Sequence, residues 1–126
     1  MRGRTLANLA VSVAAAGCAV ASRSSETPRN FIDRTEIATT RASTAWDAVQ
    51  QLRPDFLRGR AVASNNRVST ETPIVFLDDT RLGELDQLRT IPASIVLSIQ
   101  LISASDATTR WGTGYPAGVI EVRTRS

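Results

Sequence analysis

The chain begins with an apolar stretch that limits how much of it can fold. After a basic start, residues 5–16 carry no charge and are mostly apolar. A positive start followed by such a run is typical of a secretory signal peptide, and the run is well short of the roughly 20 residues that a membrane-spanning helix needs. A buried amphipathic helix is the alternative, but only Asn8 and Ser12 interrupt the apolar run. We therefore expect residues 1–17 to be a signal peptide.

The chain has one cysteine, Cys18, which follows Ala15-Ala16-Gly17 at the end of this stretch. The segment resembles the lipobox of bacterial lipoproteins, although Ala15 stands where Leu is commonest. The resemblance implies cleavage before Cys18 and a diacylglycerol on its sulfur, and two acyl chains hold a small domain stably on a membrane. Ordinary cleavage after Ala19-Val20-Ala21 is the alternative. Residues 18–30 have no periodicity, so we interpret them as a lipidated tether.

The charged residues exclude several classes of function. All 15 basic residues are Arg, so chemistry that depends on His or Lys is absent. Removal of residues 1–17 leaves 13 Arg against 12 acidic residues and lowers the formal net charge from +3 to about +1. A nucleic-acid binder needs a basic surface, so we expect no nucleic-acid partner. We also expect no enzyme, no cofactor and no metal site, and a single cysteine cannot form an internal disulfide.

The ordered domain is predicted to begin with a helix. Asp33 can cap this helix and Glu36 can complete the capping box. An apolar stripe at spacings of three and four over residues 38–56 predicts one long helix, which we expect to end just before Pro54.

The rest of the pattern predicts a small α+β domain over residues 31–126, with a three- to four-stranded mixed sheet packed by one longer and two short helices. The later elements are, in order, a loop over 57–73, a strand over 74–77, a short helix over 82–91, a strand over 95–102, a capped helical turn over 105–112 and a strand over 118–124. The predicted core consists of Ile37, Ala45, Trp46, Val49, Leu52, Ile74, Phe76, Leu85, Leu88, Ile99, Leu101, Trp111, Val119 and Val122.

Three polar segments could form a catalytic or ligand-binding site, but each has a simpler structural explanation. The paired carboxylates Asp78-Asp79 favour a turn, because Asp tolerates positive φ there, and no His or third carboxylate lies nearby. Arg58, Arg60 and Arg67 could form an anion site, although solvated loop arginines are the default. The glycine-rich segment 112–118 precedes a strand, whereas a phosphate cradle precedes a helix.

Five segments of the later chain form a series of motifs, namely PIVFLD at 73–78, RLGELDQL at 81–88, IPAS at 91–94, ATTRWG at 107–112 and GVIEVRT at 118–124. Through these motifs the chain from Phe31 to Arg125 resembles the plug domain of TonB-dependent outer-membrane receptors. The resemblance implies a plug-like fold and a place in the bacterial envelope.

The departures from that family matter as well. Asp79 stands where the family favours Gly, and Ile95 and Leu97 replace acidic positions beside the second strand. An apolar patch at that point is a candidate partner surface. We find neither residues for the receptor's β-barrel after Ser126 nor an energy-coupling segment before Phe31. We therefore expect a stand-alone plug-like domain, without the barrel and without transport activity.

These observations predict a non-enzymatic, lipid-anchored binding or adaptor domain on the periplasmic face of the outer membrane. Its expected partner is an envelope protein, for example a TonB-dependent transporter or another outer-membrane protein. The alternatives are a small structural envelope protein or a receptor remnant, and a soluble periplasmic location. The sequence leaves open which partner or ligand binds, whether the domain enters a barrel, and its oligomeric state.

Expression of the full-length chain in a bacterium tests the lipid anchor. We expect the intact mass from the membrane fraction to show cleavage before Cys18 and added acyl chains, and we expect Cys18→Ser to lose both. A soluble product that begins at Ser22 would contradict lipidation and support ordinary cleavage.

Overall fold

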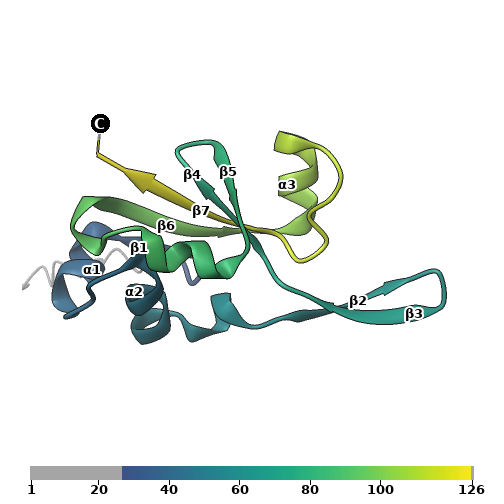
Figure 1. Cartoon of the computed structure of the whole chain (residues 1–126), viewed down its shortest axis with the longest axis horizontal. Coiled ribbons are helices and arrows are strands. Elements are labelled where there is room, and N and C mark those ends of the chain that lie inside the picture. The colour runs from purple at the N-terminus through teal and green to yellow at the C-terminus, as the bar shows by residue number, and fades with distance from the viewer. Residues whose placement is uncertain (1–26, 126) are drawn as a thin grey trace, which may run out of the picture.

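The computed structural model describes residues 27–125 (Figure 1). The predicted signal peptide over 1–17, the lipidation site Cys18 and most of the tether lie outside the described residues. Within the described part, no helix is long and apolar enough to cross a membrane.

A five-stranded mixed sheet forms the centre of the domain, with the strand order β1-β6-β7-β4-β5. The strands are β1 (Phe31–Asp33), β4 (Ile74–Leu77), β5 (Thr80–Gly83), β6 (Val96–Ile102) and β7 (Val119–Thr124). Strands β4 and β7 run parallel, and the other neighbours are antiparallel. The predicted α+β class and its three strands are confirmed. The predicted count of three to four strands was too low, because β1 and β5 add to the two edges of the sheet.

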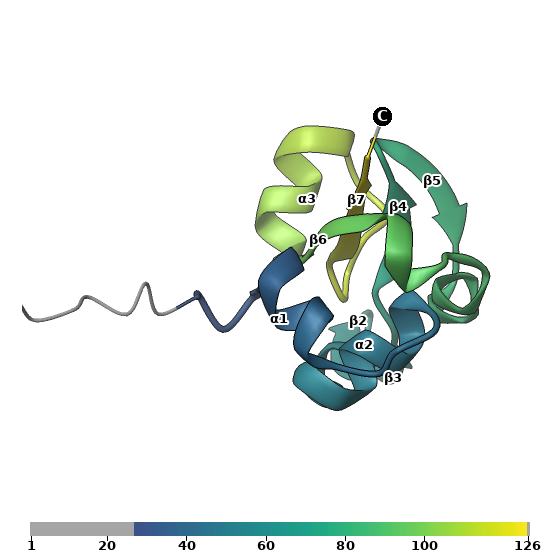
Figure 2. The same ribbon diagram turned by 90° about the vertical axis from the view of Figure 1, so that its left-hand side faces the viewer.

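Helices cover both faces of this sheet (Figures 1 and 2). One face packs against α1 (Arg34–Thr39), α2 (Ala45–Leu52) and the 3₁₀ turns η1 (Pro54–Leu57), η2 (Leu85–Thr90) and η3 (Ala93–Ile95). The other face packs against α3 (Ala104–Trp111), in a smaller cluster around Phe76, Ile102 and Val119. The Trp111 ring lies against Phe76, with the ring centroids 4.5 Å apart.

The prediction of one long first helix was wrong, because the chain breaks between Thr39 and Ala45. Each of the two helices has its own capping box, from Asp33 in α1 and from Thr44 in α2. The hydroxyl of Thr40 donates to the carbonyl of Ile37 and satisfies a backbone group at the end of α1. The apolar spacing continued across the break, so periodicity alone could not reveal it. Helix α2 does end before Pro54, as predicted.

The predicted loop over 57–73 was also wrong, because it contains a β-hairpin. Strands β2 (Arg60–Ser64) and β3 (Arg67–Glu71) pair with each other and project from the body of the domain (Figure 1). Asn65 and Asn66 connect them and both have positive φ, which is the geometry of a type I′ turn.

The two short helices also differ from their predicted form. The segment predicted as a helix over 82–91 divides into the end of β5 and the 3₁₀ turn η2. Helix α3 is longer than the predicted single turn, because Ser103 rather than Ser105 is its N-cap. It ends at Gly112, as predicted.

Most of the predicted core is buried. The half-buried exceptions are Trp46, Leu52, Ile74, Leu101 and Trp111. The prediction missed Val75 and Ile120, which are fully buried. Both lie on β4 and β7 inside the sheet, where helices cover both faces and consecutive residues are therefore apolar.

Gly112 and Gly118 have the same φ of 89°. Replacing each by Ala therefore distinguishes the cost of backbone strain from the cost of steric overlap. A Cβ at Gly118 would overlap the carbonyl oxygen of Ile102, whereas a Cβ at Gly112 would meet nothing within 4 Å. We expect Gly112→Ala to lower the free energy of unfolding by about 1–3 kcal/mol through strain alone. Gly118→Ala should cost a further 1–3 kcal/mol, roughly, from the overlap. Urea denaturation of both variants measures the difference, and equal losses would contradict the close approach at Gly118.

Candidate functional site

Helix α3 covers only part of its face of the sheet. Side chains alternate along a strand, so Ser98 and Gln100 of β6 share this face with Glu121 and Arg123 of β7. The register pairs Ser98 with Arg123 and Gln100 with Glu121. The part of the sheet that α3 leaves open, here called the open face, is therefore polar.

A charged cluster of Glu121, Arg110, Arg123 and Asp79 lies where α3 meets the open face. Glu121 is only 3% exposed, and it is the one charged side chain buried in the described residues. Arg110 donates to both of its carboxylate oxygens, at 3.1 and 3.2 Å, and Arg123 donates to one of them at 2.6 Å. Both oxygens of Glu121 are thus occupied, as a buried carboxylate requires.

Arg110 connects three elements of the fold. Besides Glu121 on β7, it contacts Asp79 in the β4–β5 turn at 3.3 Å, and its guanidinium lies 4.2 Å from the Trp111 ring centroid. The hydrogen bonds to Glu121 raise the pKa of the Arg110 guanidinium above its ordinary value. The charged cluster therefore fastens α3 to the sheet, and its carboxylate is not free to act as a general base.

The predicted turn at Asp78-Asp79 is confirmed, and both residues have positive φ. Asp78 accepts hydrogen bonds from the backbone N–H of Thr124, at 2.9 Å, and from its hydroxyl. These two bonds lower the pKa of the Asp78 carboxyl. Asp78 thus binds the end of β7, and Asp79 binds Arg110 of α3. Among residues 27–125, no group of three or more His, Cys, Asp or Glu side chains could hold a metal ion.

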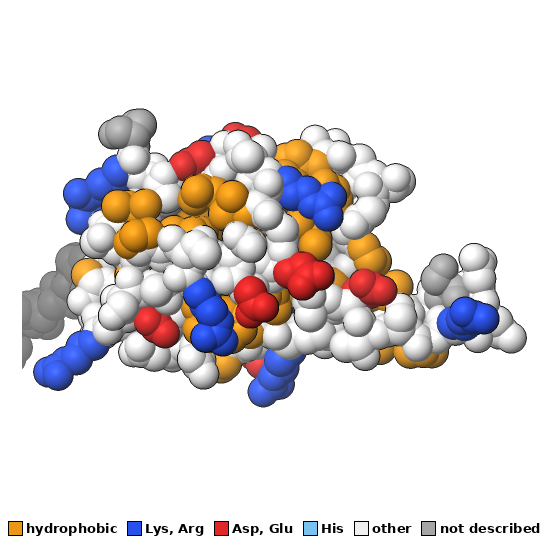
Figure 3. Space-filling model, viewed as in Figure 1, with side chains coloured by type: hydrophobic (Ala, Val, Ile, Leu, Met, Phe, Trp, Pro, Cys, Tyr) orange, Lys and Arg blue, Asp and Glu red, His pale blue; other side chains and the backbone are white. Residues whose placement is uncertain are grey.

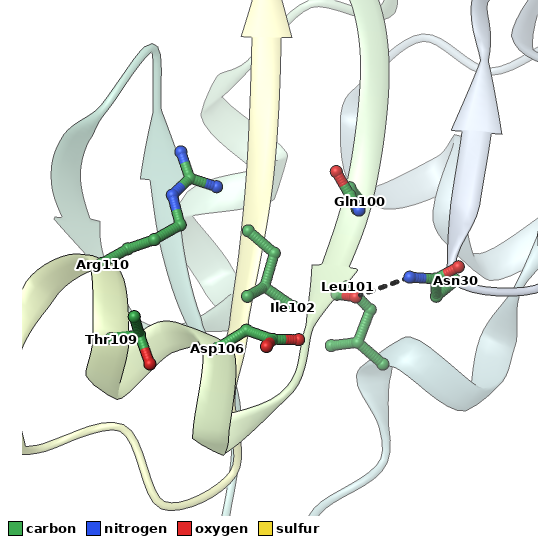
Figure 4. A pocket seen from close by; sticks show the side chains of 7 residues that line it. All are labelled: Asn30, Gln100, Leu101, Ile102, Asp106, Thr109 and Arg110. Carbon is green, nitrogen blue, oxygen red and sulfur yellow. Dashed lines mark hydrogen bonds between the residues drawn. The ribbon is translucent and has the colours of Figure 1, made fainter.

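A groove of about 320 Å³ lies between α3 and β6 (Figure 4). Its lining residues are Asn30, Gln100, Leu101, Ile102, Asp106, Thr109 and Arg110. Figure 4 shows that they come from α3, from β6 and from the segment before β1. The side-chain amide of Asn30 donates to the carbonyl of Leu101 at 3.4 Å. Five of these seven lining residues are polar or charged, and Leu101 and Ile102 are the apolar ones.

Ile95 and Leu97, which the sequence marked as a candidate partner surface, form an exposed apolar patch. They are 42% and 39% exposed, and Val96 between them is buried. The register of β6 against β7 shifts between Val96 and Ser98, which makes Leu97 the extra residue of a β-bulge. Because a bulge interrupts the alternation, Val96 and Ile99 can both face the core while Leu97 faces solvent. Figure 3 shows apolar side chains gathered over the start of β6.

The three loop arginines do not converge on an anion site. Arg58 pairs with Asp55 at 3.1 Å, and both side chains are largely exposed. Arg60 and Arg67 stand at opposite ends of the β2–β3 hairpin, opposite Glu71 and Ser64. The charged cluster escaped the sequence analysis, although the alternation Glu121, Val122, Arg123 in an apolar strand was a signal that two charges share one face.

No protein-family model matches the chain, and no curated protein matches it. A solved structure that resembles it is a chain of the RagAB peptide importer in the open-open state, with 14% identity and a TM-score of 0.48. The likeness covers 75% of this chain but only 12% of that chain.

Asp78 makes the stability of the domain depend on pH. Its pKa in the folded state lies below the ordinary value of 3.8, so its bonds to Thr124 stabilise the fold above pH 3.8 and are lost as the pH falls through the lowered pKa. We expect Asp78→Ala to lower the free energy of unfolding at pH 7, and we expect its difference from wild type, here called the gap, to become smaller below pH 3.8. Urea denaturation across this range measures the gap.

Thr124→Val is the matched control, because it removes only the hydroxyl that donates to Asp78. It should show a smaller gap that narrows in the same pH range. A gap for Asp78→Ala that stays constant between pH 7 and pH 3 would contradict the role of the carboxylate charge.

Proposed function

We propose that this chain is a non-enzymatic protein-binding domain of the bacterial envelope, anchored by lipid at Cys18, which docks its apolar patch of Ile95 and Leu97 against an envelope protein. The observation that carries the proposal is the exposure of these two large apolar side chains beside a β-bulge. A β-bulge re-aims a side chain, and bulges are over-represented at sheet edges and next to active sites.

The surroundings of the apolar patch resemble the rim of a protein interface. Ser98 follows the patch on β6, and the backbone N–H of Arg125 donates to the carbonyl of Ile95 at 3.1 Å. Arg125 is exposed. An apolar centre with polar and charged residues around it is typical of protein interfaces. The positive charge of Arg125 beside the patch favours a partner whose matching surface carries an acidic side chain.

The non-enzymatic part of the proposal draws support from the charged residues. A buried carboxylate such as Glu121 is a candidate general acid or base. Arginines, however, donate hydrogen bonds to both of its oxygens. The remaining candidate pair, Asp78 and Asp79, is engaged by Thr124 and by the arginines of the charged cluster. These groups all serve the fold, which leaves the exposed surface as the part of the domain suited to function.

The envelope location rests on the N-terminal sequence and on the plug-like segments at 73–78 and 118–124. A lipid at Cys18 and a short tether would hold the domain close to the outer membrane, facing the periplasm. The proposed partner is therefore an outer-membrane protein, of which a TonB-dependent transporter is one example.

Photo-crosslinking in living bacteria tests the docking. We expect a photoreactive phenylalanine analogue at position 97 of the full-length chain to give one main adduct, with an outer-membrane protein that mass spectrometry identifies. Ile95→Arg should reduce this adduct about tenfold or more, because it places a charge in the apolar centre of the interface.

Val68→Arg is the matched control, because Val68 is also exposed, at 76%, but lies on the distant hairpin. It should leave the adduct at position 97 unchanged. An absent adduct, or one that Ile95→Arg and Val68→Arg reduce equally, would contradict docking through the apolar patch and favour a structural protein or a receptor remnant.

A further inference from the structure

The β2–β3 hairpin is a second surface, independent of the apolar patch, and it has no partner in the described chain beyond its own two strands. Its five residue pairs run from Arg60 opposite Glu71 to Ser64 opposite Arg67, without a bulge. An isolated two-stranded hairpin is only marginally stable in water. Each strand also presents one edge of unpaired backbone groups, which can add another strand.

The outer edge of β3 has none of the features that usually block such pairing. It contains no Pro, no Lys and no bulge, and Val68 on it is 76% exposed. In a hairpin with a two-residue turn, the pair that flanks the turn is hydrogen-bonded, and bonded and non-bonded pairs then alternate. Val68 and Thr70 therefore belong to the non-bonded pairs, and their backbone groups face outward.

The charges on β3 indicate which strand this edge fits. Its sequence Arg67-Val68-Ser69-Thr70-Glu71 has opposite charges at its two ends and a neutral centre. If two such strands pair antiparallel about Ser69, Arg67 of each copy lies opposite Glu71 of the other. Opposite charges in cross-strand pairs stabilise a sheet, and like charges destabilise it. Arg67 forms no ion pair with the residues that the structure describes, so its charge is available.

The outward-facing backbone N–H and C=O groups are also placed correctly for antiparallel pairing about Ser69. Pairing about Ser69 places Val68 opposite Thr70 of the second copy, and these are the residues whose N–H and C=O groups face outward. Parallel pairing in the same register would instead place Arg67 beside Arg67. The β2 edge has no comparable match, because antiparallel pairing about Val62 sets Arg60 opposite the neutral Ser64.

We propose that the outer edge of β3 pairs with the same edge of a second copy of this chain, so that the two hairpins form one continuous antiparallel sheet across a two-fold axis at Ser69. The dimer buries the exposed edge and joins Arg67 to Glu71 of the second copy twice, once on each side of the axis. It also leaves the apolar patch of each copy free, because the hairpin projects away from the body of the domain (Figure 1).

Disulfide trapping in the full-length chain tests the register. On the axis, Ser69 lies opposite Ser69 of the second copy as a non-bonded pair, for which the Cα atoms are about 4.5 Å apart, within the range that a disulfide spans. We expect Ser69→Cys to form a covalent dimer under mild oxidation at least about tenfold faster than Ser94→Cys, which alters an exposed residue outside the hairpin. The wild-type chain controls for any dimer formed through Cys18.

Charge reversal in the Ser69→Cys background then tests the pairing of Arg67 with Glu71. We expect Arg67→Glu and Glu71→Arg each to slow cross-linking about tenfold, because each places like charges opposite one another. An equal mixture of the two variants should restore the rate to about half of the original, because opposite charges meet again in the mixed dimer, which half of the encounters form. Circular dichroism establishes that each variant is folded.

Three results would overturn the proposal. The Ser69→Cys variant could cross-link no faster than the Ser94→Cys variant, the charge reversals could leave the rate unchanged, or the mixture could stay as slow as its components. Pairing of the edge with a strand of another protein would give the first of these results with the purified chain.

Discussion

The buried carboxylate of Glu121 is the constraint on which the arrangement of layers depends. It lies on β7, the central strand of the sheet, and a buried charge without partners would be strongly unfavourable. Arg110 satisfies it only when α3 lies across the sheet, and Arg123 only when β7 continues to its end. Helix α3, the β4–β5 turn and the last strand are thereby held in one geometry. The apolar contacts among Phe76, Trp111 and Tyr115 add to the same attachment.

This attachment leaves the rest of the surface free for recognition. The apolar patch lies at the start of β6, beyond the part of the sheet that α3 covers, and the hairpin projects from the opposite end of the domain (Figure 1). A bulge positions the patch and a type I′ turn shapes the hairpin. The patch lies where η3 meets the start of β6, and the hairpin consists of two paired strands. Neither surface is an irregular loop, which favours a defined geometry for a binding partner.

The sequence predicted the elements whose signals are local. The strands over 74–77 and 119–124, the helix end at Gly112 and the turn at Asp78-Asp79 were all recovered, because apolar runs, glycine and paired Asp act within a few residues. The apolar patch was also anticipated. Three features were missed because each depends on contacts made only when distant segments meet. They are the break before Thr44, the pairing of Phe31–Asp33 and the contact of Glu121 with Arg110. The hairpin was missed because its strands carry little apolar periodicity, so that the Asn65-Asn66 pair is the main local signal of the turn between them.

The most direct test of this account is a double-mutant cycle on Arg110 and Glu121, with Arg110→Met, Glu121→Gln and their combination compared by urea denaturation. We predict a coupling energy of about 1–3 kcal/mol, because one member of the pair is buried. The exposed pair Arg58 and Asp55 is the matched reference, and its coupling should not exceed about 0.5 kcal/mol. Equal coupling energies for the two pairs would contradict the claim that Glu121 holds α3 on the sheet.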